Sequence, residues 1–179
     1  MESGAGERGS NTHVEIATAA RGGRMATTAE ARAAIAWLRA AERLATVVGI
    51  EYIVSLTDPS TGELLTEGTA DVIMQSLDTT SITAIDWKTG RRENVARAND
   101  NLQLAAYAIG AAMSAGASRA DWKIVFLDGD TVEVDPSAVY DKAEWWPWTD
   151  RIRAIQAKAP IAHPGPHCGS CYSRQVCPS

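Results

Sequence analysis

Two aspartates and a lysine are placed where their side chains could act together. Asp86, Trp87 and Lys88 close a stretch rich in strand-forming residues, and the two-residue period of a strand puts Asp86 and Lys88 on one face. Asp71 belongs to the preceding stretch of this kind, and a hairpin would return its strand beside the one that ends at Asp86. Neighbouring carboxylates repel each other unless a cation intervenes, and Mg²⁺ binds one or two carboxylates together with phosphate oxygens of a substrate. The spacing therefore predicts a metal-assisted phosphodiester site.

A second triplet of the same composition, Asp121-Trp122-Lys123, serves as an internal comparison. It begins a predicted strand and is not preceded by a hairpin that carries a Gly-x-x-Asp sequence. We interpret it as a solvated strand edge without a role in chemistry.

Four more polar residues lie near these candidates in the expected structure. Gln103 and Tyr107 are four residues apart on a predicted helix and so share a face, although such residues are also typical of a helix's solvent edge. Glu51 opens a predicted strand, and His13 follows a Gly- and Ser-containing segment near the N-terminus.

Helices and strands alternate in a way that positions these residues. The expected helices are a short one over residues 13–20 after a loose segment 1–12, a long one over 28–48 opened by a capping box of Thr27 and Glu30, and one over 101–113. A further helix is expected to start at Asp135 and Pro136, run to residue 158 and kink at Pro147.

Two groups of strands are expected between these helices. Short polar links predict an antiparallel meander over residues 50–56, 70–77 and 81–88, and Asp128-Gly129-Asp130 predicts a hairpin of 122–127 with 131–134. The fold class is therefore α/β, a central mixed sheet flanked by helices.

Length and composition limit the class of protein. A chain of 179 residues with 45% hydrophobic and 22% charged residues is typical of one folded domain and not of a disordered segment. Its apolar stretches are too short to cross a bilayer, and no signal-peptide pattern opens it, so we expect a cytoplasmic protein without a membrane partner. The net charge of −5 gives no overall basic field, which neither indicates nor excludes DNA.

All three cysteines, Cys168, Cys171 and Cys177, lie in the last twelve residues. An odd, clustered set favours metal ligation over disulfides. Four prolines also follow Ala159. We therefore divide the chain into a domain over residues 1–158 and a Cys-rich tail over 159–179 that packs on it.

Taken together, the motifs resemble those of the RecB-like exonucleases of the PD-(D/E)XK nuclease superfamily. The resemblance covers residues 8–177, and 15 residues separate Asp71 from Asp86. The Cys-x-x-Cys-x5-Cys sequence resembles the tail of the superfamily's iron–sulfur members, including CRISPR-associated RecB-like exonucleases. The motifs, in chain order, are Gly9-x-x-x-His13, Glu51, Gly68-x-x-Asp71, Ile85-Asp86-Trp87-Lys88-Thr89-Gly90 and Gln103-x-x-x-Tyr107.

The resemblance implies a role for each of these residues. His13, Asp71, Asp86 and the backbone carbonyl of Trp87 would hold Mg²⁺ or Mn²⁺. Lys88 would orient or activate the attacking water and offset charge on the phosphate. Glu51 would help to bind a second metal, while Gln103 and Tyr107 would contact the DNA backbone and steady the lysine.

The tail departs from the family pattern, because iron–sulfur members use four cysteines and residues 1–167 contain none. Three alternatives stay open. The tail holds a [4Fe–4S] cluster through Cys168, Cys171 and Cys177 with a fourth ligand from elsewhere, holds zinc as Cys₃His with His163 or His167, or binds no metal.

The resemblance predicts a Mg²⁺- or Mn²⁺-dependent deoxyribonuclease that removes nucleotides from single-stranded DNA or duplex ends, in recombination, CRISPR adaptation or phage DNA processing. The alternative is a catalytically weak DNA-binding or assembly subunit that retains the fold. Expected partners are DNA, further copies of the chain, or a recombination or CRISPR protein in a bacterial, archaeal or phage-infected cell. A zinc-ribbon interaction protein is disfavoured, because the chain has only one ligand-rich knuckle.

Overall fold

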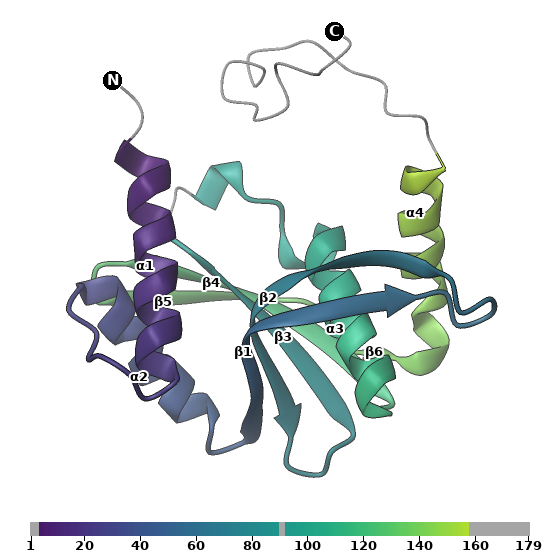
Figure 1. Cartoon of the computed structure of the whole chain (residues 1–179), viewed down its shortest axis with the longest axis horizontal. Coiled ribbons are helices and arrows are strands. Elements are labelled where there is room, and N and C mark those ends of the chain that lie inside the picture. Colours follow the sequence, from purple (N-terminus) through teal and green to yellow (C-terminus); the bar gives the residue numbers. More distant parts are fainter. Residues whose placement is uncertain (1–3, 90–91, 158–179) are drawn as a thin grey trace, which may run out of the picture.

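A mixed β-sheet with helices on both faces forms the centre of the molecule, as the sequence predicted (Figure 1). The structure is a computed structural model that describes residues 4–89 and 92–157. The sheet order is β1-β2-β3-β4-β5, with β6 also beside β4. The strands are β1 (Ala45–Thr57), β2 (Leu64–Ser76), β3 (Ser81–Lys88), β4 (Arg119–Asp128), β5 (Thr131–Pro136) and β6 (Tyr140–Asp141). The α-helices are α1 (Gly4–Ala20), α2 (Ala29–Ala41), α3 (Leu102–Ala115) and α4 (Trp146–Gln156).

The first three strands form the predicted antiparallel meander. After β3 the chain crosses over through α3 and returns as β4, which pairs with β3 in parallel. The predicted Asp-Gly hairpin then joins β4 to the antiparallel β5.

Two apolar cores hold the helices to the sheet, because successive residues of a strand point to opposite faces. Ile82 and Ala84 of β3 lie in the core shared with α3 and α4, whereas Ile85 and Trp87 lie in the core shared with α1 and α2. By the same alternation, Asp86 and Lys88 lie on the α3 side of the sheet.

The N-terminal helices differ from the prediction in their bounds. Helix α1 already begins at Gly4, so residues 4–12 are helical and not loose. Helix α2 ends at Ala41, and residues 45–48 pair with β2 instead of continuing the helix to 48. This segment contains the β-branched Thr46, Val47 and Val48, which fit a sheet better than a helix. The helix cap is Thr28, whose hydroxyl accepts from the Ala31 N–H, and not Thr27.

The helix expected from Asp135 is absent, because Asp135 and Pro136 complete β5. The Asp135 carboxylate accepts the Ala98 N–H at 3.1 Å, and Pro136 sits at a strand end, where it breaks no ladder. Helix α4 begins only at Trp146, which places Pro147 in its first turn, so the predicted kink does not occur.

The tail that carries Cys168, Cys171, Cys177, His163 and His167 lies outside the described residues. Within the described part of the chain, no helix has both the length and the hydropathy needed to cross a bilayer.

Candidate nuclease site

The site begins where β2 and β3 stop pairing. Their pairing runs from Gln75↔Ile82 to Val72↔Ile85, so Asp71 and Asp86 are the next residues on the two strands. On the β2 side, where the pairing has ended, the Trp87 N–H donates to Asp71 Oδ2 at 2.8 Å. The end of this ladder therefore places two carboxylates on neighbouring strands, as the sequence predicted.

Lys88 contacts Asp86, which lies two residues earlier on the same strand face. Its Nζ is 2.9 Å from Oδ1 and 2.7 Å from Oδ2 of Asp86. Oδ2 is buried and accepts no hydrogen bond, because the lysine approaches it outside hydrogen-bonding geometry. Burial raises the pKa of the Asp86 carboxyl above its ordinary value, and the hydrogen bond from Lys88 opposes the rise.

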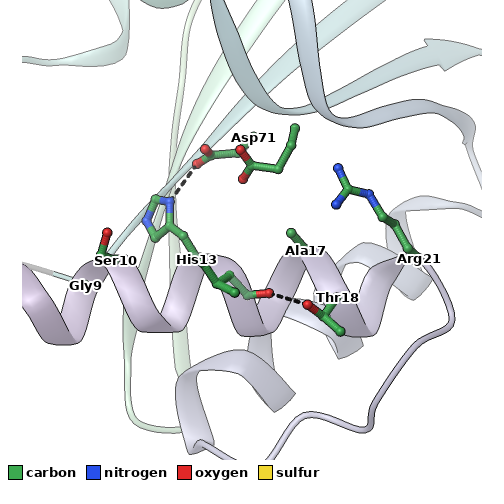
Figure 2. Close-up of a pocket in the computed structure, with 9 residues that line it drawn as sticks. Gly9, Ser10, His13, Ala17, Thr18, Arg21 and Asp71 are labelled. Carbon is green, nitrogen blue, oxygen red and sulfur yellow. Dashed lines mark hydrogen bonds and ion pairs between the residues drawn. The ribbon is translucent and has the colours of Figure 1, made fainter.

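His13 of α1 approaches the Asp71 carboxylate from the helix that packs on the sheet. Its Nδ1 lies 3.4 Å from Asp71 Oδ2 (Figure 2). The Asp71 carboxylate raises the pKa of His13 above its usual value, against the effect of burial. Helix α1 lies close to the end of β3, because a Cβ on Gly9 would be 3.2 Å from Thr89 Oγ1.

Glu51 lies on β1, the strand next to the one that carries Asp71. The neighbouring pairs Ile50↔Val72 and Tyr52↔Ala70 place Glu51 of β1 directly opposite Asp71 of β2. Glu51 has a φ of 50°, in the left-handed region that costs a non-glycine residue energy, and such strained residues cluster at functional sites. Burial, followed by the charge of Asp71, raises the pKa of the Glu51 carboxyl.

Helix α3 brings the predicted Gln103 and Tyr107 together. Gln103 Nε2 donates to the Tyr107 hydroxyl at 2.8 Å. The Tyr107 ring packs directly on Gly68 of β2, where a Cβ would come within 2.9 Å of ring carbon Cε1. The buried position of Tyr107 contradicts a solvent edge for this residue, while Gln103 is exposed.

The second triplet is not at a solvated edge, which corrects the prediction. Strand β4 lies inside the sheet, and Trp122 is fully buried. Asp121 is only 8% exposed and accepts a hydrogen bond from the Thr83 hydroxyl at 2.8 Å. Because Asp86 is level with Ile124 on β4, Asp121 points to the opposite face of the sheet. The structure therefore gives Asp121 a buried, hydrogen-bonded place on the face away from Asp86.

A cavity of about 510 Å³ lies between α1 and the middle of β1 and β2, where Glu51 and Asp71 line it. It is lined by Gly9, Ser10, His13, Val14, Ala17, Thr18, Arg21, Glu51 and Asp71. Arg21 is the residue that the sequence reasoning missed. Its signal was its position eight residues after His13 and one residue past the end of α1, which continues the side of the helix that carries His13.

The donor atoms suit a hard divalent cation. Mg²⁺ takes one or two carboxylates, and the site offers those of Asp71 and Asp86, the latter paired with the Lys88 ammonium. Over residues 4–89 and 92–157, however, no three His, Cys, Asp or Glu side chains are arranged around one metal position. His13 is directed to Asp71 and Lys88 to Asp86. The Trp87 ring packs edge-on against Trp37 at 5.6 Å, which leaves only its backbone for the predicted role.

Comparison with known proteins agrees with this geometry. The profile described as the PD-(D/E)XK nuclease superfamily matches residues 7–178. The chain belongs to the PD-(D/E)XK nuclease superfamily.

Matches to individual proteins are weaker. No curated protein matches the chain significantly. Among solved structures, "Crystal structure of SSO0001" aligns with a TM-score of 0.42 and 14% identity, over 98% of this chain and 71% of that one. A likeness at this level carries no argument about function.

Proposed function

We propose that the protein is a Mg²⁺- or Mn²⁺-dependent DNA exonuclease of the RecB-like type, acting on single-stranded DNA or duplex ends. The observation that carries this proposal is the pair Asp71 and Asp86 at the end of the β2–β3 ladder, with the Lys88 ammonium against Asp86. The superfamily to which the chain belongs consists generally of nucleases. The proposed roles are recombination, CRISPR adaptation or phage DNA processing in the cytoplasm of a bacterial, archaeal or phage-infected cell.

Each residue of the site has a proposed task. Asp71, Asp86, His13 and the Trp87 carbonyl hold the cation, and Glu51 supports a second one. A cation bound there lowers the pKa of the attacking water and stabilises charge on the phosphate. Lys88 orients that water and offers its ammonium to the phosphate oxygens. Gln103 and Tyr107, hydrogen-bonded to each other, contact the DNA backbone and steady the lysine, and the packing of Tyr107 on Gly68 fixes their position.

The tail forms a second proposed metal centre. Thiolates of Cys168, Cys171 and Cys177 would hold a [4Fe–4S] cluster, or zinc together with His163 or His167. Metal and sulfide analysis of anaerobically purified protein distinguishes these two cases. A folded protein that contains neither iron nor zinc contradicts both.

The activity is tested with end-labelled single-stranded and duplex DNA, incubated with Mn²⁺ or with EDTA. We expect labelled ends to be shortened progressively with Mn²⁺ and unchanged with EDTA. Circular single-stranded DNA is the control for end dependence and should stay intact. Cleavage of the circle at the same rate would mean that the protein is an endonuclease and not an exonuclease.

One observation favours the second candidate, a catalytically weak DNA-binding or assembly subunit. In the described part of the chain, the histidine and the two aspartates do not surround one metal position. The same assay separates the candidates, because this subunit would bind the DNA without shortening it.

A further inference from the structure

Arg21 shares the cavity with His13, Glu51 and Asp71 of the proposed site. His13 and Ala17 of α1 and Arg21, the residue directly after the end of α1, follow one another at four-residue intervals, and all three line the cavity. Figure 2 shows the Arg21 side chain extending from the end of α1 on the same side as His13. Eight residues of helix correspond to about 12 Å along its axis. His13 and Arg21 therefore lie at separate points along one wall.

The guanidinium of Arg21 makes few contacts within the described residues. Its Nη2 donates to the Ile50 carbonyl at 2.6 Å. Within residues 4–89 and 92–157 it has no carboxylate partner within ion-pair distance, unlike Arg39 and Arg153. A guanidinium carries five N–H donors in a planar fork that matches two phosphate oxygens. Most of these donors are thus left for a ligand.

The cavity has the size and walls to receive a nucleotide. Its volume of about 510 Å³ falls among those of small-molecule sites, roughly 300–1,000 Å³. The α1 wall carries small side chains at Gly9, Ser10 and Ala17, which leave the space open. Asp71 and Glu51, on the opposite wall, repel a phosphate in the absence of a cation, so the protein alone attracts a phosphate best at the Arg21 end.

We propose that Arg21 binds the phosphate next to the scissile one, and that the cavity holds the nucleotide between these two phosphates. This inference rests on the proposed nuclease function, because the scissile phosphate defines one end of the nucleotide. It assigns to the end of α1 a contact with the DNA strand that His13 alone does not provide.

Arg21 also ties the end of α1 to β1 through the Ile50 carbonyl, and the test must separate this tether from phosphate binding. Arg21→Gln keeps an N–H donor for the carbonyl and removes the charge, whereas Arg21→Ala removes both. Arg43→Ala is the matched control. Arg43 is exposed, does not line the cavity, and its side chain has no hydrogen bond or ion pair within the described ranges.

The measurement is the affinity for a fluorescent single-stranded oligonucleotide, without divalent ions, over a series of salt concentrations. Each phosphate neutralised on a single strand contributes about 0.7 to the slope of log K against log salt. We expect both Arg21 variants to lose about this much slope and to bind about tenfold more weakly at low salt. Arg43→Ala should keep the wild-type slope.

Two results would overturn the inference. Wild-type slope and affinity in Arg21→Gln, with only Arg21→Ala weakened, would leave Arg21 as a tether. Equal behaviour of both variants and Arg43→Ala would remove it from the binding surface. The proposed function is tested separately. If the wild type never cleaves DNA but its salt slope depends on Arg21, the nuclease function is refuted and the phosphate site stands. If it cleaves DNA and its salt slope does not depend on Arg21, only this inference is refuted.

Discussion

Replacing Gly68 by alanine tests how the Tyr107 ring is held beside the proposed catalytic strands. The added Cβ would clash with the Tyr107 hydroxyl oxygen and lie 2.9 Å from ring carbons Cε1 and Cζ. Cβ atoms in proteins essentially never approach other atoms closer than 3.0 Å, so the ring must move. Gly68 does not have a positive φ, so the backbone itself accepts alanine.

The two effects on stability have opposite signs. Without the clash, alanine in a strand interior stabilises the fold relative to glycine by about 0.5–1 kcal/mol. With the clash, overpacking costs about 1–3 kcal/mol. Because the ring is buried and its hydroxyl accepts from Gln103, we expect the clash to exceed the gain. In a chain of 179 residues, each 1 kcal/mol lost lowers Tm by about 2–4 °C.

Thermal unfolding of four proteins isolates this contact: wild type, Gly68→Ala, Tyr107→Ala and the double variant. We expect Gly68→Ala to lower the Tm of the wild type and to leave the Tm of Tyr107→Ala unchanged or higher. An equal loss of Tm in both backgrounds would refute the reasoning, since glycine would then be required for its backbone and not for the ring.

Three further predictions concern the surroundings of the site. Hydrogen bonds from Thr27 and Thr28 lower the pKa of Glu15 to about 2 from 4.5, so its ionised form stabilises the fold. Urea unfolding should therefore show wild type more stable than Glu15→Gln above about pH 4.5, with the difference vanishing as the pH falls towards 2; a constant difference would contradict this. Asn101 caps α3 through the Leu104 N–H, and Asn101→Ala should cost about 1 kcal/mol in urea unfolding; an unchanged midpoint would exclude the cap. Saturating Mn²⁺ should raise the Tm of wild type but not of Asp86→Asn; equal rises would place the cation elsewhere.

Local patterns predicted the meander, α3 and the β4–β5 hairpin, because short polar links and turn residues act within a few residues of one another. The bounds near the N-terminus were wrong where tertiary contacts decide. Residues 45–48 have helical apolar spacing, but pairing with β2 makes them strand. Asp135 and Pro136 suit a helix start, yet the hairpin holds them in β5.

The site shows the same division between local and distant effects. Hairpin folding alone predicted that Asp71 and Asp86 are neighbours. The contact of Tyr107 with Gly68 and the burial of Asp121 depend on the crossover through α3 and on the strand order, which no local pattern contains. Arg21 was overlooked because its place at the cavity depends on how α1 packs on the sheet.

The central claim is that Asp86, and not Asp121, belongs to a nuclease site. Both aspartates begin an Asp-Trp-Lys triplet and both are largely buried, so Asp86→Asn and Asp121→Asn form a matched pair. Asparagine keeps the size of the side chain, and at Asp121 its oxygen can still accept from the Thr83 hydroxyl. Near-wild-type Tm values for both variants establish that they fold.

The decisive measurement is the rate at which wild type and the two variants shorten end-labelled single-stranded DNA with Mn²⁺. Loss of an electrostatic contribution of this kind typically costs about 10²–10³-fold in rate. The account predicts such a loss for Asp86→Asn and wild-type activity within a few-fold for Asp121→Asn. Equal rates for the two variants, or cleavage by Asp86→Asn at the wild-type rate, would contradict it.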